Sequence, residues 1–189
     1  MEHPTPNSTK KIVLTALLAA LTVAGSAIRV TIPVDIAGTT SFHLGNIMCA
    51  LSGILLGPLY GAAAAGIGSA IYDMLNPLYI SEAWITFLTK AAYGLVPGLI
   101  MLLWKKNWGA VKAAIAAAGG ALTYAALYLL KTYAYSGRLL KGLTHEAAML
   151  AVATKIPATI FNAVIAIVFA PILAVAIRKA LEKNRLTLE

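Results

Sequence analysis

The stretch at residues 41–97 reads SFHLGNIMCALSGILLGPLYGAAAAGIGSAIYDMLNPLYISEAWITFLTKAAYGLVP. Two apolar runs meet at a Gly-Pro pair, a polar cluster follows at 72–76, and a third apolar run carries Lys90. Ionisable residues inside apolar segments are costly in a lipid bilayer, so they usually line a site or pair with one another. The stretch therefore indicates membrane helices that enclose a polar site.

The composition of the whole chain points to the same class. Of its 189 residues, 60% are hydrophobic and 12% are charged, and the mean hydropathy is +0.81. An ordinary soluble domain is roughly 25% charged. The apolar runs reach the roughly 17–25 residues that span a bilayer, and the alternating segments of a transmembrane barrel are absent from the sequence. We predict an all-α membrane protein.

Outward from the deciding stretch, we expect a disordered cytoplasmic tail at residues 1–9 and a single domain at 10–189. The first apolar run imitates a signal peptide, but five similar runs follow, which favours a retained helix. The loop at 29–42 contains Pro and Gly, so it should be neither helix nor tight turn. The last span exceeds the bilayer thickness and should tilt, project inward or kink at Pro157 or Pro171. The six expected transmembrane helices, which form one bundle, are 11–29, 43–57, 59–75, 83–104, 109–131 and 146–178.

The basic residues are distributed as in a membrane protein and not as in a nucleic-acid-binding protein. The net charge is +8, but most Lys and Arg flank apolar runs, as in cytoplasmic loops. Six spans place both termini on one side, which holds Lys10, Lys11, Lys105, Lys106, Lys112, Arg178, Lys179, Lys183 and Arg185. The opposite side holds Arg29, Lys131, Arg138 and Lys141. This bias predicts that both termini are cytoplasmic.

Four of the expected spans carry polar or aromatic residues at helical spacing, which places them on one face of each helix. The four stripes lie at a similar depth in the outer half, so they predict a cavity open to the outside, with aromatic walls and fixed hydrogen-bond donors. The stripes are Ser69, Tyr72, Asp73 and Asn76; Thr86, Lys90, Tyr93 and Pro97; Tyr124, Tyr128, Lys131 and Tyr135; and Lys155, Thr159 and Asn162. The candidate ligand residues are Asp73, Asn76, Lys90, Tyr93, Tyr124, Tyr128, Lys155 and Asn162, with His43 and Asn46 at the start of the second span.

Several of these residues have a structural alternative. Asp73 and Lys90 either neutralise each other across two helices or contact a ligand, and pairing does not exclude lining the site. Lys131 lies near the interface and is expected to snorkel to water. The tyrosines of the fifth span form either a cavity wall or an interfacial belt. His43 is either a residue of the helix start or a ligand contact.

The sequence contains no signature of catalysis. It has no HExxH, no GxSxG, no carboxylate pair at helical spacing and no P-loop. The three histidines are far apart and there is one cysteine, so neither a metal site nor another cofactor is expected. The chain is therefore not predicted to be an enzyme, and energy for transport would come from another subunit or an ion gradient.

The first span has a stripe of small residues, Ala16, Ala20 and Ala24, spaced four apart. Small residues let membrane helices approach closely. The stripe predicts either packing inside the bundle or a docking face for a partner helix.

The segments FHLGNIMCALSGILLGPLYGAAAAGIGSAIYDML and TFLTKAAYGLVPGLI resemble the substrate-binding S-components of energy-coupling factor (ECF) transporters, which import vitamins in prokaryotes. The resemblance implies that a small nutrient binds near the outer face of the plasma membrane, under the loop that joins spans one and two. It also implies that the face of Ala16, Ala20 and Ala24 docks onto a membrane scaffold subunit carrying two ATPases, and that the S-component topples in the bilayer to deliver its ligand.

Within that family the sequence is most similar to the pantothenate, pyridoxine-type and queuosine-precursor branches, and it lacks the N-terminal His motif of the cobalt and nickel branches. Two other classes remain open at this point. One is a standalone proton-coupled transporter with Asp73 and Lys90 as its relay. The other is a membrane enzyme or structural subunit with a cavity facing lipid.

The charge bias generates a topology prediction. Reporter fusions placed after Lys141 and after Glu189 should report opposite sides of the membrane, with the fusion at Glu189 in the cytoplasm. The same side for both fusions would contradict the six-span topology.

Overall fold

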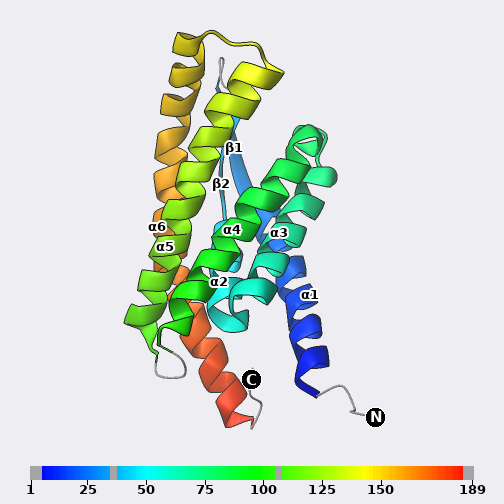
Figure 1. The fold of residues 1–189 in the computed structure, drawn as a ribbon, viewed down its shortest axis with the longest axis vertical. Helices are drawn as coiled ribbons and strands as arrows, with labels where there is room; N and C mark the ends of the chain where they lie inside the picture. The colour runs from blue at the N-terminus through cyan, green and yellow to red at the C-terminus, as the bar shows by residue number, and fades with distance from the viewer. Residues whose placement is uncertain (1–5, 35–37, 105–107, 185–189) are drawn as a thin grey trace.

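Six α-helices form where the sequence has its apolar runs, in a computed structural model that describes residues 6–34, 38–104 and 108–184 (Figure 1). The described ends of the helices lie within about five residues of the expected spans. The helices are α1 (Pro6–Ala27), α2 (Gly45–Leu56), α3 (Pro58–Met74), α4 (Ala83–Leu102), α5 (Ala110–Lys131) and α6 (His145–Lys183). The expected tail overlaps the start of α1, and its residues 1–5 lie outside the described part of the chain.

Four helical segments are long and apolar enough to cross a membrane, among the residues that the structure describes. They are Thr9–Ala27, Ile80–Leu102, Ala110–Leu140 and His145–Lys183. The 12 residues of α2 and the 17 of α3 extend only about 18 and 26 Å at 1.5 Å per residue. The protein is therefore a multi-pass helical membrane protein, and the expected six full crossings are supported for four of the helices.

The break between α2 and α3 has a local cause. Gly57 has a φ of 78°, in the left-handed region that glycine adopts without strain, and Pro58 opens α3, where its missing N–H leaves no hydrogen bond unmade. The two short helices thus form a helical hairpin in place of one continuous span.

The expectation of a purely helical fold is wrong at residues 29–43, which contain a β-hairpin. Strand β1 (Arg29–Val34) pairs antiparallel with β2 (Gly38–His43), from Arg29 opposite His43 to Val34 opposite Gly38. The β-branched residues Val30, Thr31 and Ile32 favour an extended backbone, and Pro33 is tolerated because a two-stranded sheet has only edge strands. The Pro and Gly residues correctly excluded a helix here, but apolar and polar residues do not alternate regularly enough in this segment to predict strands.

The chain after α5 also differs from the expectation, which has a span ending at residue 131 and the next one beginning at 146. The chain continues from α5 into a π-helix, η2 (Thr132–Leu140), before α6 begins. A short 3₁₀-helix, η1 (Ile80–Glu82), precedes α4. Helix α6 runs unbroken through Pro157 and Pro171 for 39 residues, and its C-terminal turns project beyond the start of α5 (Figure 1).

The helices form two groups with the hairpin between them. Helix α3 packs against α1, α2 and α4, while α5 packs against α4 and α6. In Figure 1 the two strands rise between the α5–α6 pair and the α3–α4 pair. The start of α1 and the end of α6 lie at the same end of the bundle, and η2 lies at the opposite end (Figure 1). The basic segment 105–107, which contributes to the predicted charge bias, lies outside the described residues.

Three glycines bring α2, α3 and α4 into backbone contact. A Cβ atom added at Gly53 would lie 2.2 Å from the carbonyl oxygen of Gly94, one at Gly94 would lie 2.4 Å from that of Gly61, and one at Gly61 would lie 2.5 Å from Cα of Gly53. Small residues are the usual means of close helix packing in lipid, where the hydrophobic effect does not drive helices together. This contact explains why the third span is rich in glycine and alanine.

The contact predicts that Gly94→Ala destabilises the bundle. The new methyl group would overlap the backbone of α3, and overpacking of this kind costs about 1–3 kcal/mol. Thermal unfolding in detergent should show a clear fall in Tm. Gly109→Ala is the control, because a Cβ there meets no described atom within 4 Å. Equal stability of the two variants would contradict the close approach.

Candidate functional site

A cavity lies between the hairpin and helices α3, α4, α5 and α6, toward the end of the bundle that carries η2. Its lining is mainly polar and draws on every one of these elements. The lining residues are Ser26, Arg29, Thr39, Thr40, Ser41, His43, Asn46, Ser69, Asp73, Tyr79, Glu82, Thr86, Thr89, Lys90, Tyr124, Tyr128, Lys131, Lys155, Ala158, Thr159 and Asn162. The four polar stripes predicted from the sequence thus meet at one site.

Eight of the ten candidate ligand residues line this cavity: His43, Asn46, Asp73, Lys90, Tyr124, Tyr128, Lys155 and Asn162. The other two, Asn76 and Tyr93, lie outside its lining. The Asn76 amide donates to the Tyr72 hydroxyl at 3.3 Å and accepts from the backbone N–H of Leu78 at 3.0 Å, so it orders the loop after α3. Tyr93 is fully buried behind Tyr124.

The hairpin is fastened to α6 through one side chain. The Asn162 side-chain oxygen accepts from the backbone N–H of His43 at 3.0 Å, and its amide nitrogen donates to the carbonyl oxygen of Ser41 at 2.8 Å. Next to this pair, the rings of Phe42 and Phe161 meet edge to face at 4.9 Å. Asn162 therefore lines the cavity, but its side-chain amide already accepts one hydrogen bond from the hairpin backbone and donates another to it.

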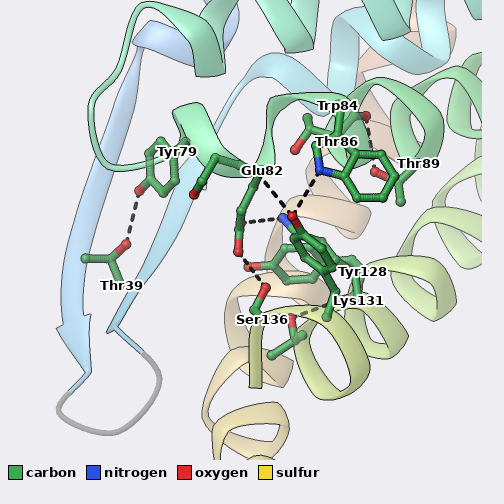
Figure 2. Close-up of polar contacts among 12 residues, drawn as sticks. Thr39, Tyr79, Glu82, Trp84, Thr86, Thr89, Tyr128, Lys131 and Ser136 are labelled. Atoms are coloured by element: carbon green, nitrogen blue, oxygen red, sulfur yellow. Dashed lines mark hydrogen bonds and ion pairs between the residues drawn. The ribbon is translucent and has the colours of Figure 1, made fainter. Parts of the chain in front are cut away.

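A second attachment joins the hairpin to the loop before α4. The Tyr79 hydroxyl lies 3.1 Å from the Thr39 hydroxyl and 3.4 Å from that of Ser41 (Figure 2). The Arg29 guanidinium lies over the rings of Tyr72 and Tyr79, at 4.2 and 5.1 Å from their centroids. These contacts hold the hairpin against the last turn of α3, which carries Tyr72, and against the loop that carries Tyr79.

Sequence analysis missed the contributions of Arg29, Tyr79 and Glu82, and of Thr39 to Ser41, to the cavity lining. None of them belongs to a helical stripe, because they lie in the hairpin, in η1 and in the loop before it. The isolated arginine directly after an apolar span was the one available signal.

One wall of the cavity is a stack of tyrosines. The ring centroids of Tyr93 and Tyr124 are 5.2 Å apart with an interplanar angle of 15°, and those of Tyr124 and Tyr128 are 5.6 Å apart at 27°. Nζ of Lys90 lies 3.8 Å from the Tyr124 centroid, a cation–π contact. The tyrosines of α5 are thus part of the cavity wall, which decides between the two alternatives left open by the sequence.

Lys90 does not form an ion pair with Asp73. Its ammonium donates to the side-chain oxygen of Asn46, and it is 4% exposed. Within the described part of the chain, ion pairs closer than 4 Å join Lys131 to Glu82 and Arg178 to Glu182. Asp73 and Lys90 therefore face the same cavity as separate charges.

The expectation that Lys131 snorkels to water is wrong. Lys131 is 8% exposed and contacts Glu82 at 2.5 Å, and the other carboxylate oxygen of Glu82 accepts from Ser136 at 2.5 Å (Figure 2). Beside them, the Trp84 indole N–H donates to the Tyr135 hydroxyl at 3.0 Å. Sequence analysis could not supply this partner, because Glu82 lies in η1, 49 residues earlier in the chain. The cluster ties η1 and the start of α4 to the end of α5 and to η2.

The charges that line the cavity are unequal in number. Four cations (Arg29, Lys90, Lys131 and Lys155) face two carboxylates (Asp73 and Glu82), and one ion pair is formed among them. Lys155 has no carboxylate within 4 Å among the described residues, and its Nζ lies 5.6 Å from the Tyr128 centroid. The lining therefore favours a ligand that offers an anionic or carbonyl-rich group.

His43 contributes a neutral ring at the base of the hairpin. Burial lowers the pKa of His43 well below its usual value, and the positive charges of Lys90 and Arg29 lower it further. Its Nδ1 is shielded from solvent and has no hydrogen-bond partner among the described residues. A buried polar atom of this kind is one that a ligand can satisfy.

Comparison with known proteins identifies the family. The family described as ECF-type riboflavin transporter, S component, matches residues 6–179. The chain belongs to this family. An uncharacterized protein in a gap 3′ region of Pyrococcus woesei is 37% identical over 79 residues, which cover 42% of this chain. The match spans half the length of that relative.

Membership in the ECF S-component family confirms the resemblance that the sequence showed. The family is one of transporter S components and not of enzymes.

Proposed function

We propose that the cavity beneath the hairpin binds a small, water-soluble nutrient for import, of the pantothenate, pyridoxine-type or queuosine-precursor class. The observation that carries this proposal is the combination of a stacked tyrosine wall with two cations, Lys90 and Lys155, that have no carboxylate partner within 4 Å among the described residues. Rings of this kind stack on flat ligands, and the ammonium groups donate charge-assisted hydrogen bonds.

The proposal assigns roles to several of the lining residues. Tyr124 and Tyr128 provide the stacking face, and Lys155 meets a carboxylate or a carbonyl-rich edge of the ligand. Lys90, oriented by Asn46, supplies a second donor. Asn162 and the hydroxyl of Tyr79 hold the hairpin over the bound nutrient.

We propose that the alanine stripe of α1 docks on the ECF scaffold subunit, which carries two ATPases. Ala16, Ala20 and Ala24 are all exposed. The opposite face of α1 is the one that packs inside the bundle, where Leu18 and Thr22 are buried. The stripe is therefore not used for packing within this chain. Its smooth surface suits close approach of another membrane helix.

The proposal places the protein in a prokaryotic plasma membrane with both termini in the cytoplasm. It treats residues 10–189 as one domain because the cavity draws on all six α-helices, the hairpin and η1. A standalone proton-coupled transporter receives less support. Its relay would need Asp73 and Lys90 in contact, and they do not form an ion pair.

Lys155→Met tests the assignment of the ligand site. The ligand is first identified by native mass spectrometry of protein purified from cells grown in rich medium. Loss of a hydrogen bond from a charged group costs about 1.5–3 kcal/mol, so the affinity should fall about 10- to 150-fold. Calorimetric titration of the identified nutrient into both folded proteins measures this.

Lys141→Met is the matched control, because Lys141 is exposed at the end of η2 and does not line the cavity. It should bind within threefold of the wild type. A change of less than threefold for Lys155→Met as well would assign Lys155 a structural role and remove the basic-pocket interpretation.

Ala20→Leu tests the docking face. The larger side chain roughens the stripe without reaching the cavity, so nutrient binding by the purified protein should be unchanged while ATP-driven uptake in cells falls severalfold. Ala126→Leu, at an exposed position of α5, should leave both properties intact. Equal loss of binding and uptake for Ala20→Leu would show that α1 supports the bundle and not the partner.

A further inference from the structure

Two cation–aromatic pairs lie away from the cavity, at the end of the bundle where α1 begins and α6 ends (Figure 1). The Arg178 guanidinium lies 4.8 Å from the centroid of the Trp108 ring, on the last turns of α6. Nζ of Lys112, in the first turn of α5, lies 5.9 Å from the centroid of the Trp104 ring, which follows α4. We call these four residues the basic corner. None of them lines the cavity.

Arg178 is held in a fixed orientation and still has donors to offer. Its Nε donates to the Glu182 carboxylate at 2.8 Å, and its Nη1 donates to the carbonyl oxygen of Trp108 at 3.0 Å. A guanidinium has five N–H donors, so three of them have no partner among the described residues. The Arg178 side chain is 33% exposed, so an outside group can reach it. Its planar fork suits a phosphate group, which it can bind through two parallel hydrogen bonds.

The depth of the basic corner matches the headgroup level of one membrane leaflet. Trp84 marks the opposite level, where its indole N–H donates to the Tyr135 hydroxyl. Trp84 and Trp104 are 20 residues apart, which corresponds to about 30 Å along a helix at 1.5 Å per residue. The hydrocarbon core of a bilayer has about this thickness, and tryptophan is enriched at both of its edges. Trp104 therefore lies where the acyl chains meet the phosphate groups.

The surface next to the basic corner is apolar, and the end of the bundle around it is basic. Exposed apolar side chains adjoin the corner at the end of α4 and the start of α5: Leu102, Leu103 and Val111. The other described cations at this end are Lys10, Lys11, Lys179 and Lys183, and the one described carboxylate is Glu182, which Arg178 already binds. A cationic surface and an apolar surface thus meet at the edge of the hydrocarbon core.

We propose that the basic corner binds an anionic phospholipid. Arg178 and Lys112 bind its phosphate, and its acyl chains lie along the exposed apolar side chains at the end of α4 and the start of α5. Anionic lipids attract basic residues next to a membrane helix, and the apolar neighbours favour a lipid over a soluble polyanion. A zwitterionic lipid is disfavoured because its own cation would meet the same positive charges. This inference needs only the membrane-spanning helices, so it does not depend on the identity of the transported nutrient.

A lipid titration followed by native mass spectrometry tests the proposal. Delipidated protein in detergent is titrated with dioleoyl phosphatidylglycerol or with dioleoyl phosphatidylcholine, which have the same acyl chains and differ in net charge. Each cation near the headgroup should favour the anionic lipid about fivefold. The two cations of the corner should therefore give phosphatidylglycerol an affinity about 25-fold higher. Equal affinity for the two lipids would overturn the proposal, and this comparison requires no variant.

Arg178→Gln and Lys112→Gln locate the lipid on the protein. Each substitution removes one cation, so each should lower the preference for phosphatidylglycerol about fivefold. Lys112→Gln leaves the hydrogen bonds of Arg178 in place, so it still tests the corner if Arg178→Gln does not fold. Arg138→Gln is the matched control, because Arg138 is exposed on η2 at the opposite end of the bundle. Full preference in the corner variants, or an equal loss in Arg138→Gln, would overturn the assignment.

Competition with inorganic phosphate separates a lipid from a free ion as the occupant. A large excess of phosphate should leave phosphatidylglycerol bound, because the ion lacks the acyl chains that contact the apolar side chains. Displacement of the lipid by phosphate in the wild-type protein would show that the corner binds the ion alone, which would overturn the assignment of a lipid.

Discussion

The cavity depends on the two hydrogen bonds between the Asn162 amide and the backbone of β2. Backbone polar groups placed among membrane helices need partners inside the protein, because lipid offers none. The hairpin meets this need partly through its own ladder and partly through Asn162, which satisfies the N–H of His43 and the carbonyl of Ser41. Together with the contacts of Tyr79 and Arg29, this side chain keeps an extended segment inside a helical bundle, and the cavity lies beneath that segment.

The charged residues that line the cavity also need partners, and the protein supplies them for only some of these residues. Glu82 and Lys131 neutralise each other and join η1 to α5, so they contribute to the frame of the cavity. Lys90 is held by a neutral amide, and Lys155 and Asp73 have no ionic partner within the described residues. Charged groups that have no ionic partner in the free protein can interact with a ligand. A fully paired network would leave a ligand no charged group to bind.

Close packing of α2, α3 and α4 explains how short helices can support such a site. Gly53, Gly61 and Gly94 allow the backbones of these helices to touch, which fixes the positions of Asp73 on α3 and Lys90 on α4. The longer helices α5 and α6 then carry the tyrosine wall and Lys155 on the other side.

The sequence by itself determined the membrane class, the limits of the helices to within a few residues and eight of the ten candidate residues in the cavity, because these follow from hydropathy and from helical spacing along one chain. Only the tertiary structure decided the rest. It showed that residues 29–34 and 38–43 pair as strands, that Glu82 neutralises Lys131, and that Asp73 and Lys90 form no ion pair. Each of these depends on groups brought together from distant parts of the chain, and local pattern carries no information on which distant partner a charge or a strand will meet.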